Sequence, residues 1–90
     1  MNKSELVDSI AEKSGLNKTQ AADALNAMME SVGEALENNE TISLVGFGTF
    51  SVKDRKARTG RNPKTGDELQ IPASRVPHFK AGKGLKDRLN

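Results

Sequence analysis

The sequence predicts an α+β fold for one small domain that spans residues 1–90. Apolar residues recur every three or four positions across residues 1–40, which is the period of a helix. From residue 41 they alternate with polar residues, which is the period of a strand. Two helices, a hairpin, a long arm, a return strand and a terminal helix are therefore expected in that order, and this order indicates the α+β class.

The first helix is expected to begin directly after Asn2. Asn2 and Glu5 have the N-cap and N3 spacing of a capping box, in which each side chain can bond the backbone of the other residue. Gly15 suits the left-handed backbone position that ends many helices. The stripe expected to face the core consists of Leu6, Val7, Ile10 and Ala11.

The second helix is expected to follow at once and to complete a helical base over residues 1–40. Asn17 and Gln20 repeat the capping-box spacing at its start. Gly33 weakens it by about 1 kcal/mol relative to alanine, and Asn38-Asn39 ends it. Its apolar stripe, rich in small residues, suits close packing against more than one neighbour; it comprises Ala21, Ala24, Leu25, Met28, Val32, Ala35 and Leu36.

Residues 41–52 predict a β-hairpin, with a turn at Gly46-Phe47-Gly48 between two short alternating runs. Residues 76–82 are expected to return as a third strand of the body sheet. Residues 83–90 then form a short C-terminal helix.

Residues 53–75 form a basic segment with too few apolar residues to bury a core of its own. A strong turn signal, Asn62-Pro63-Lys64-Thr65-Gly66, lies at its middle, so the segment is expected to run out and back as a β-ribbon arm. An isolated two-stranded ribbon is marginal in water, and we expect the arm to be mobile until it binds. Three acids oppose its seven cations, which are Lys53, Arg55, Lys56, Arg58, Arg61, Lys64 and Arg75.

The net charge of +2 hides an uneven distribution along the chain. Residues 1–40 carry three cations and eight acids, a net of −5, whereas residues 41–90 carry eleven cations and four acids, a net of +7. This division predicts an anionic partner for the second half. The alternative is a solvated surface whose charges are merely uneven.

Catalytic and metal-binding functions find no support in the residues. His78 is the only histidine, and no cysteine is present to share a metal with it. No nucleophile has a base at a plausible spacing, and no acidic cluster suits Mg²⁺. We therefore expect no enzyme, no metal site and no cofactor.

The sequence also indicates where the protein works. The absence of cysteine fits a reducing compartment. Residues 1–6 are followed by no apolar region typical of a signal peptide, and no apolar run reaches membrane-spanning length. A cytosolic location is expected.

The body outside the arm is near the size at which one chain struggles to bury enough apolar surface. An obligate oligomer is the simplest remedy, since no disulfide can stabilise it. The aromatic residues could be base-stacking platforms, but a body so poor in aromatics needs them inside. We therefore predict a dimer core that contains Phe47, Phe50 and Phe79.

Four motifs resemble the bacterial histone-like HU and integration host factor family: MNKSEL (1–6), LVGFGTF (44–50), GRNPKTG (60–66) and KAGKGLKDRLN (80–90). The resemblance implies an intertwined dimer with a helical base and two β-ribbon arms that reach around DNA through the minor groove. It further implies a histone-like protein that wraps, bends and compacts duplex DNA on the bacterial nucleoid with little sequence specificity. Distorted, nicked or pre-bent DNA should bind best, because part of the bending cost is already met.

The same resemblance implies the residues that meet DNA. Pro63 at the arm tip would intercalate between base pairs and kink the duplex, although from composition alone a proline there can simply initiate a turn. Lys3 and Lys83 would lie near helix N-termini, which favour phosphate. The complete set of expected DNA-binding residues is Lys3, Lys53, Arg55, Arg58, Arg61, Asn62, Pro63, Lys64, Arg75, Lys80, Lys83 and Lys86.

Other interpretations remain open at this point. His78 and Arg88 are closer to an integration host factor subunit, which would read specific sites and pair with a second chain as a heterodimer, whereas the opening motif and the length are closer to HU. Gly84 stands where the family commonly has alanine, so the last helix is expected to be weak. A basic arm could instead enter structured RNA or bind an acidic protein surface, because phosphate is common to RNA and DNA.

Overall fold

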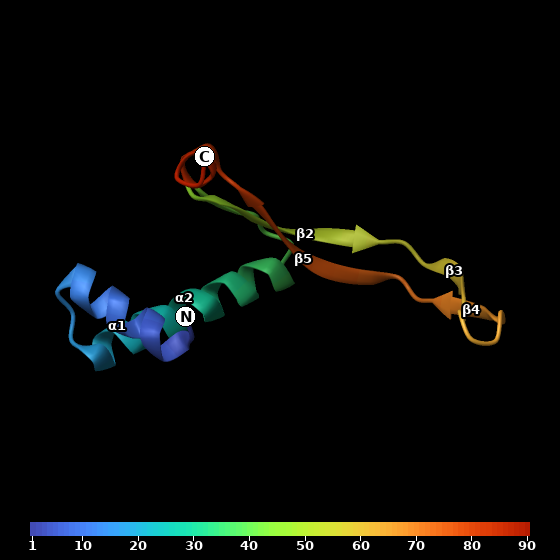
Figure 1. Cartoon of the computed structure of the whole chain (residues 1–90), viewed down its shortest axis with the longest axis horizontal. Coiled ribbons are helices and arrows are strands. Elements are labelled where there is room, and N and C mark those ends of the chain that lie inside the picture. Colours follow the sequence, from blue (N-terminus) through green and yellow to red (C-terminus); the bar gives the residue numbers. More distant parts are fainter. The chain divides into compact units, whose positions relative to one another are not determined.

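The helices and strands follow one another in the order that the sequence predicts, which confirms the α+β class (Figure 1). The structure is a computed structural model that describes residues 1–90. Its elements are α1 (Lys3–Ser14), α2 (Lys18–Glu37), β1 (Ile42–Leu44), β2 (Gly48–Arg55), β3 (Arg58–Arg61), β4 (Glu68–Ile71), β5 (Ser74–Ala81) and α3 (Lys83–Asp87). The chain divides into a first unit, Met1–Glu34, and a second unit, Ala35–Asn90.

Helix α1 has the ends that its sequence predicts. The backbone N–H of Glu5 donates to Oδ1 of Asn2 at 2.9 Å, so Asn2 is the N-cap. At the other end Gly15 adopts a φ of 79°, and its N–H donates to the carbonyl of Ala11. A residue with a side chain would be strained at this φ, so glycine fixes the end of the helix here.

Helix α2 begins with a complete capping box. The N–H of Gln20 donates to Oδ1 of Asn17 at 2.8 Å, and the N–H of Asn17 donates to Oε1 of Gln20 at 3.2 Å. The helix ends at Glu37, and Asn39 follows in the left-handed region with a φ of 58°. The expected boundaries of both N-terminal helices are therefore confirmed.

The first unit has only a small buried core. Val7 on α1 and Ala21 on α2 are its buried apolar residues. Larger side chains, among them Leu6, Met28 and Met29, stay exposed. Contiguous exposed apolar surface of this kind is typical of an interaction site.

The second unit is built on the antiparallel sheet β1-β2-β5. Phe50 on β2 stands opposite Ile42 on β1 and opposite Phe79 on β5. The Phe79 ring lies 4.8 Å from that of Phe50 and 5.6 Å from that of Phe47, both in tilted geometry. Phe47 and Phe79 are nevertheless 46% and 39% exposed in the single chain, so the cluster is only partly buried.

Helix α3 is anchored on the β1–β2 turn. The N–H of Leu85 donates to the carbonyl of Gly46 at 3.0 Å. A Cβ atom at Gly84 would lie 2.6 Å from the same carbonyl oxygen, so glycine permits this close approach. The helix ends at Asp87, three residues before the C-terminal boundary expected from the sequence.

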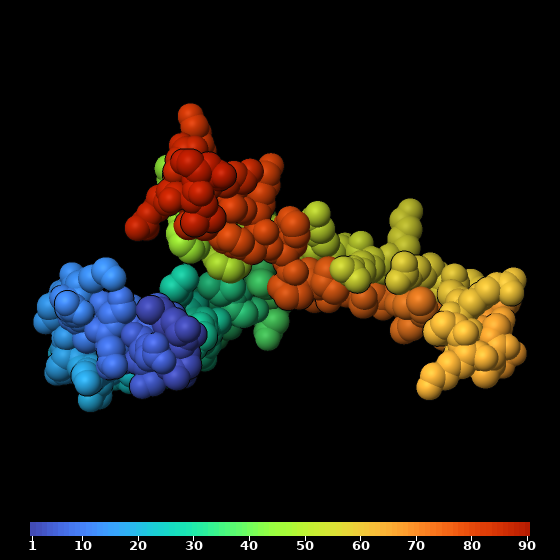
Figure 2. Space-filling model, in the orientation of Figure 1, coloured from blue at the N-terminus to red at the C-terminus, as the bar shows by residue number.

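The arm consists of two successive ladders. Strands β2 and β5 stay paired to Arg55 opposite Ser74, and β3 and β4 then pair as a separate two-stranded sheet (Figure 1). Between the ladders lie residues 56–57 on one strand and 72–73 on the other. Pro72 has no N–H to donate, which gives a physical reason for the break. Figure 2 shows the outer ladder, in yellow and orange, as a narrow ribbon with side chains that project from it.

Gly48 gives a first prediction about the sheet. We expect Gly48→Ala to lower the free energy of unfolding by about 1–3 kcal/mol, the usual cost of overpacking. A Cβ atom there would meet the Phe79 ring and lie 2.7 Å from the carbonyl oxygen of Lys80. Urea unfolding at one fixed protein concentration measures the change.

Gly33 is the matched control because a Cβ atom there has nothing within 4 Å. We expect Gly33→Ala to stabilise the protein by about 1 kcal/mol through helix propensity alone. Equal urea midpoints for the two variants would contradict the packing assigned to Gly48.

Candidate nucleic-acid interface

The residues expected to bind DNA come from both units, from five elements and from the arm tip. All are exposed except Asn62, which is half-buried. Lys3 begins α1 in the first unit, and Lys83 and Lys86 lie on α3 in the second. The others lie on the sheet and arm: Lys53 and Arg55 on β2, Arg58 and Arg61 on β3, Asn62, Pro63 and Lys64 in the tip, and Arg75 and Lys80 on β5.

Three of these cations share one face of the body sheet. Side chains alternate between the two faces of a strand, so Lys53 and Arg55 point the same way from β2. Lys80 stands opposite Thr49 in the register and lies on this face as well. The aromatic residues Phe50 and Phe79 occupy the other face. The sheet thus separates a cationic face from an apolar one.

The arm also has two different faces. Arg58 pairs with Ile71 and Gly60 pairs with Leu69, which places these four residues on one face. Leu69 and Ile71 are 45% and 37% exposed. This face combines the guanidinium of Arg58, which is flat and always charged, with the apolar side chains of Leu69 and Ile71. The combination suits a narrow DNA groove lined by phosphates.

Leu69 and Ile71 were not among the residues that the sequence assigned to DNA. Their alternation with polar neighbours at a spacing of two was the available signal. On the opposite face Arg61 stands across from Glu68. Arg61 therefore has an acid as its cross-strand neighbour, whereas Arg58 does not.

The tip of the arm is a closed turn that presents Pro63. The N–H of Asn62 donates to the carbonyl of Asp67 at 2.8 Å, and the N–H of Gly66 donates to the carbonyl of Asn62 at 2.7 Å. Gly66 has a φ of 74°. The side-chain Oδ1 of Asn62 accepts the N–H of Lys64 at 2.9 Å, so Asn62 shapes the turn. Pro63 itself is exposed.

Arg75 differs from the other candidates because its guanidinium is engaged within the chain. Its Nη2 atom donates to the carbonyls of Leu36 and Glu37 at 2.8 Å and 3.2 Å, and to Oδ1 of Asn39 at 2.7 Å. All four residues belong to the second unit. The sequence places Arg75 among the expected DNA contacts, and the structure shows that its guanidinium also has intramolecular partners.

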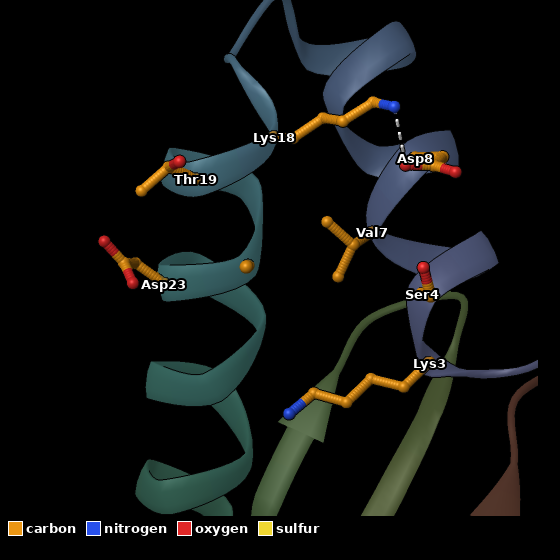
Figure 3. Close-up of a pocket in the computed structure, with 8 residues that line it drawn as sticks. Lys3, Ser4, Val7, Asp8, Lys18, Thr19 and Asp23 are labelled. Atoms are coloured by element: carbon orange, nitrogen blue, oxygen red, sulfur yellow. Dashed lines mark ion pairs between the residues drawn. The ribbon is translucent and has the colours of Figure 1, made fainter.

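The first unit contains a cleft that the sequence did not predict (Figure 3). It lies between α1 and α2, with Val7 pointing toward α2, and its charged lining residues are Lys3, Asp8, Lys18 and Asp23. Nζ of Lys18 lies 3.5 Å from Oδ1 of Asp8, with both side chains largely exposed. Such surface pairs contribute about 0–1 kcal/mol. Its two cations and two acids give the lining no net formal charge.

His78 lies half-buried on β5, across from Ser51. No three histidine, aspartate or glutamate side chains come together as a set of metal ligands. None of the helices has both the length and the apolar character needed to cross a membrane.

Known proteins resemble the chain over its whole length. A family model described as bacterial DNA-binding protein matches residues 1–90. DNA-binding protein HU of Clostridium pasteurianum is 58% identical over 90 residues, which cover 100% of this chain and 99% of that protein. DNA-binding protein HU of Geobacillus stearothermophilus is 54% identical over 87 residues, 97% of each chain.

Solved structures resemble the fold as well. The structure of Anabaena HU from a cocrystal with DNA has a TM-score of 0.92 and 49% identity, and the match covers 99% of this chain and 97% of that one. HU from Thermotoga maritima has a TM-score of 0.72 and 33% identity, with both chains covered in full.

Proposed function

The chain belongs to the bacterial DNA-binding protein family, and we infer from its arm and its relatives that it is an architectural DNA-binding protein with little sequence specificity. The observation that carries this conclusion is the exposed cationic β-ribbon of residues 53–75, in a fold with a TM-score of 0.92 to an HU chain cocrystallised with DNA. The resemblance to the HU family stated from the sequence is thereby confirmed.

We propose that the arm follows the minor groove. Arg58, Arg61 and Lys64 are exposed and carry their charge beyond the body sheet. Arginine suits a narrow minor groove, because the groove concentrates negative potential and the guanidinium is flat and always charged. Leu69 and Ile71 would contact the sugars on the same face of the ribbon as Arg58.

Pro63 is proposed as the wedge at the tip. It is exposed at the end of a turn that backbone hydrogen bonds hold closed. A rigid apolar ring without an N–H suits insertion between base pairs, and HU is itself among the proteins for which such minor-groove kinking is described. The bend would let more duplex reach the lysines Lys3, Lys53, Lys80, Lys83 and Lys86.

We propose that two copies of the chain form the DNA-binding unit. Phe47 and Phe79 are 46% and 39% exposed in the single chain, and the first unit leaves Leu6, Met28 and Met29 exposed. A body of this size is near the limit at which one chain buries enough surface to be stable alone. A second copy that covers these residues would supply the missing core and bring a second arm.

The test of the proposed function is a gel-shift series with linear, nicked and cruciform DNA, together with sizing of the free protein. Distorted DNA should bind more tightly, because part of the bending cost is already met. A dimer that prefers nicked and cruciform DNA is the expected result. Equal affinity for linear, nicked and cruciform DNA would contradict the proposed bending mechanism.

Added competitors separate the remaining alternatives. Structured RNA that displaces bent DNA at equal concentration would favour an RNA-binding arm. One preferred sequence selected from random DNA would favour a site-specific subunit like integration host factor. If RNA does not displace the DNA and no preferred sequence is selected, the protein is proposed to bind the DNA of the bacterial nucleoid with little sequence specificity.

Arg58 gives a prediction for the binding of phosphate. The slope of log K against log salt concentration is negative, and we expect Arg58→Ala to reduce its magnitude by about 0.9 for each phosphate that the arginine neutralises. Its side chain is exposed and has an uncharged residue, Ile71, across the ribbon. Titrations of one duplex at four salt concentrations measure the slope.

Lys13→Ala is the control for this measurement. Lys13 lies on α1, outside the proposed interface, and its Nζ donates to Oγ of Ser9 at 2.8 Å. Its slope should equal that of the wild type. An unchanged slope for Arg58→Ala would exclude Arg58 from the residues that bind phosphate.

A further inference from the structure

Arg75 is a cation of the arm region whose side chain binds the chain itself. Its Nη2 atom lies 2.8 Å from the carbonyl oxygen of Leu36, 3.2 Å from that of Glu37 and 2.7 Å from Oδ1 of Asn39. These acceptors are the C-terminal end of α2 and the residue that terminates it. They lie 36–39 positions away in the sequence, so the interaction joins two segments that no local pattern connects.

The C-terminal end of α2 is a place where a cationic hydrogen-bond donor is favourable. Asn39 and Glu40 donate their N–H groups to the carbonyls of Leu36 and Ala35, the Schellman arrangement that follows many helices. The N–H groups of Asn39 and Glu40 therefore do not reach the carbonyl of Glu37. The last turn of α2 also contains no basic residue, although cations are favoured at a helix C-terminus. Arg75 supplies the missing donor and the missing charge.

Arg75 also points away from the cationic face. In the β2–β5 register it pairs with Asp54, two positions from the Val52–Pro77 pair and four from the Phe50–Phe79 pair. It therefore shares the face of the aromatic residues. Lys53, Arg55 and Lys80 lie on the opposite face. A phosphate bound by those three residues would not be on the side from which Arg75 leaves the sheet.

The place of Arg75 on β5 is the root of the arm. It is the second residue of β5, next to Ser74 of the last pair of the inner ladder and two positions after the break at residues 72–73. We propose that Arg75 is a positioning residue: it clamps the root of the arm to the end of α2 and so sets the direction in which the arm leaves the sheet. This inference rests on the proposed function, because direction matters only if the arm embraces DNA.

The clamp is tested first without DNA, by a double-mutant cycle between Arg75→Met and Asn39→Gly. Glycine accepts the left-handed conformation of residue 39 and removes the side chain that carries the Oδ1 acceptor. We expect Arg75→Met to raise the unfolding equilibrium constant about tenfold or more, as for a hydrogen-bonded charge. Its effect should be smaller in the Asn39→Gly background. Strictly additive effects, or no effect of Arg75→Met, would overturn the clamp.

Positioning is tested on DNA at saturating protein, by energy transfer between dyes on the two ends of a duplex. Arg75→Met should reduce the bend at saturation and leave the slope of log K against log salt unchanged. Arg75→Lys should be intermediate in bending and stability, because the lysine side chain keeps the charge but ends one bond sooner and lacks the fork. A salt slope whose magnitude falls by about 0.9, with an unchanged bend, would make Arg75 a phosphate-binding residue instead.

Lys53→Met is the matched comparison at the same root. Lys53 is exposed on the cationic face, so its removal should reduce the magnitude of the salt slope by about 0.9 per phosphate bound and leave the unfolding constant unchanged. The cycle without DNA also separates the two proposals. If the wild type fails to bend DNA, the proposed function fails while the coupling between Arg75 and Asn39 still stands or falls by itself.

Discussion

Replacement of Pro63 by alanine is expected to reduce the bend of a bound duplex much more than it reduces affinity. Wedges of this type unstack base pairs and kink DNA by about 20–90°, and HU is among the proteins for which this range is described. Without the proline ring the protein no longer spends free energy on unstacking the base pairs, but it also loses the favourable insertion of the ring. The two changes in binding free energy therefore partly offset each other. We expect affinity for linear DNA to change by less than about tenfold, or 1.4 kcal/mol.

The tip should keep its shape in this variant. Asn62 closes the turn through its Oδ1 bond to the N–H of Lys64 and its backbone bonds to Asp67 and Gly66. None of these bonds involves Pro63, and alanine accepts the backbone conformation of a turn position that proline favours. A smaller bend would therefore report the missing wedge and not a disordered tip.

Pro72→Ala is the comparison variant, since it removes a proline ring from the arm at the break between the two ladders, away from the tip. Energy transfer across a duplex labelled at both ends, at saturating protein, measures the bend. The wedge hypothesis expects Pro63→Ala alone to open the duplex toward the straight form. Equal bend angles for Pro63→Ala and the wild type would reduce Pro63 to a residue that initiates the turn.

The features that depend on neighbouring residues were predictable from the sequence. The caps at Asn2, Gly15 and Asn17 are fixed by bonds within four residues, and each was predicted where the structure has it. The hairpin and the return strand follow from alternation alone, and the register pairs Phe50 with Phe79 as in a three-stranded body.

The features that depend on distant residues were not predictable in this way. In the sequence Arg75 resembles the other arm cations, and only the fold shows that the end of α2, 36–39 positions earlier, lies within reach of its guanidinium. The low helix propensity of glycine predicted a weak last helix at Gly84. The structure shows instead that Gly84 lies close to the Gly46 carbonyl, an approach that is possible only because residue 84 has no side chain. Both cases depend on geometry between segments, which no period or motif contains.

The aromatic cluster gives the prediction with the largest expected effect on stability. In the single chain Phe79 is 39% exposed, and such a residue would ordinarily contribute little. We nevertheless expect Phe79→Ala to lower the free energy of unfolding by about 3–5 kcal/mol, the cost of removing a fully buried ring. The reason is the second copy, which is proposed to cover the ring and complete its packing with Phe47 and Phe50.

Leu69→Ala is the control because it compares a residue of similar exposure, 45%, in the arm. No dimer core is proposed there, so the change should stay within about 0.5 kcal/mol. Thermal unfolding at several protein concentrations completes the test, since the midpoint of an obligate dimer rises with concentration. If Phe79→Ala cost no more than Leu69→Ala, and the wild-type midpoint did not depend on concentration, the cluster would face solvent and the proposed dimer core would be wrong.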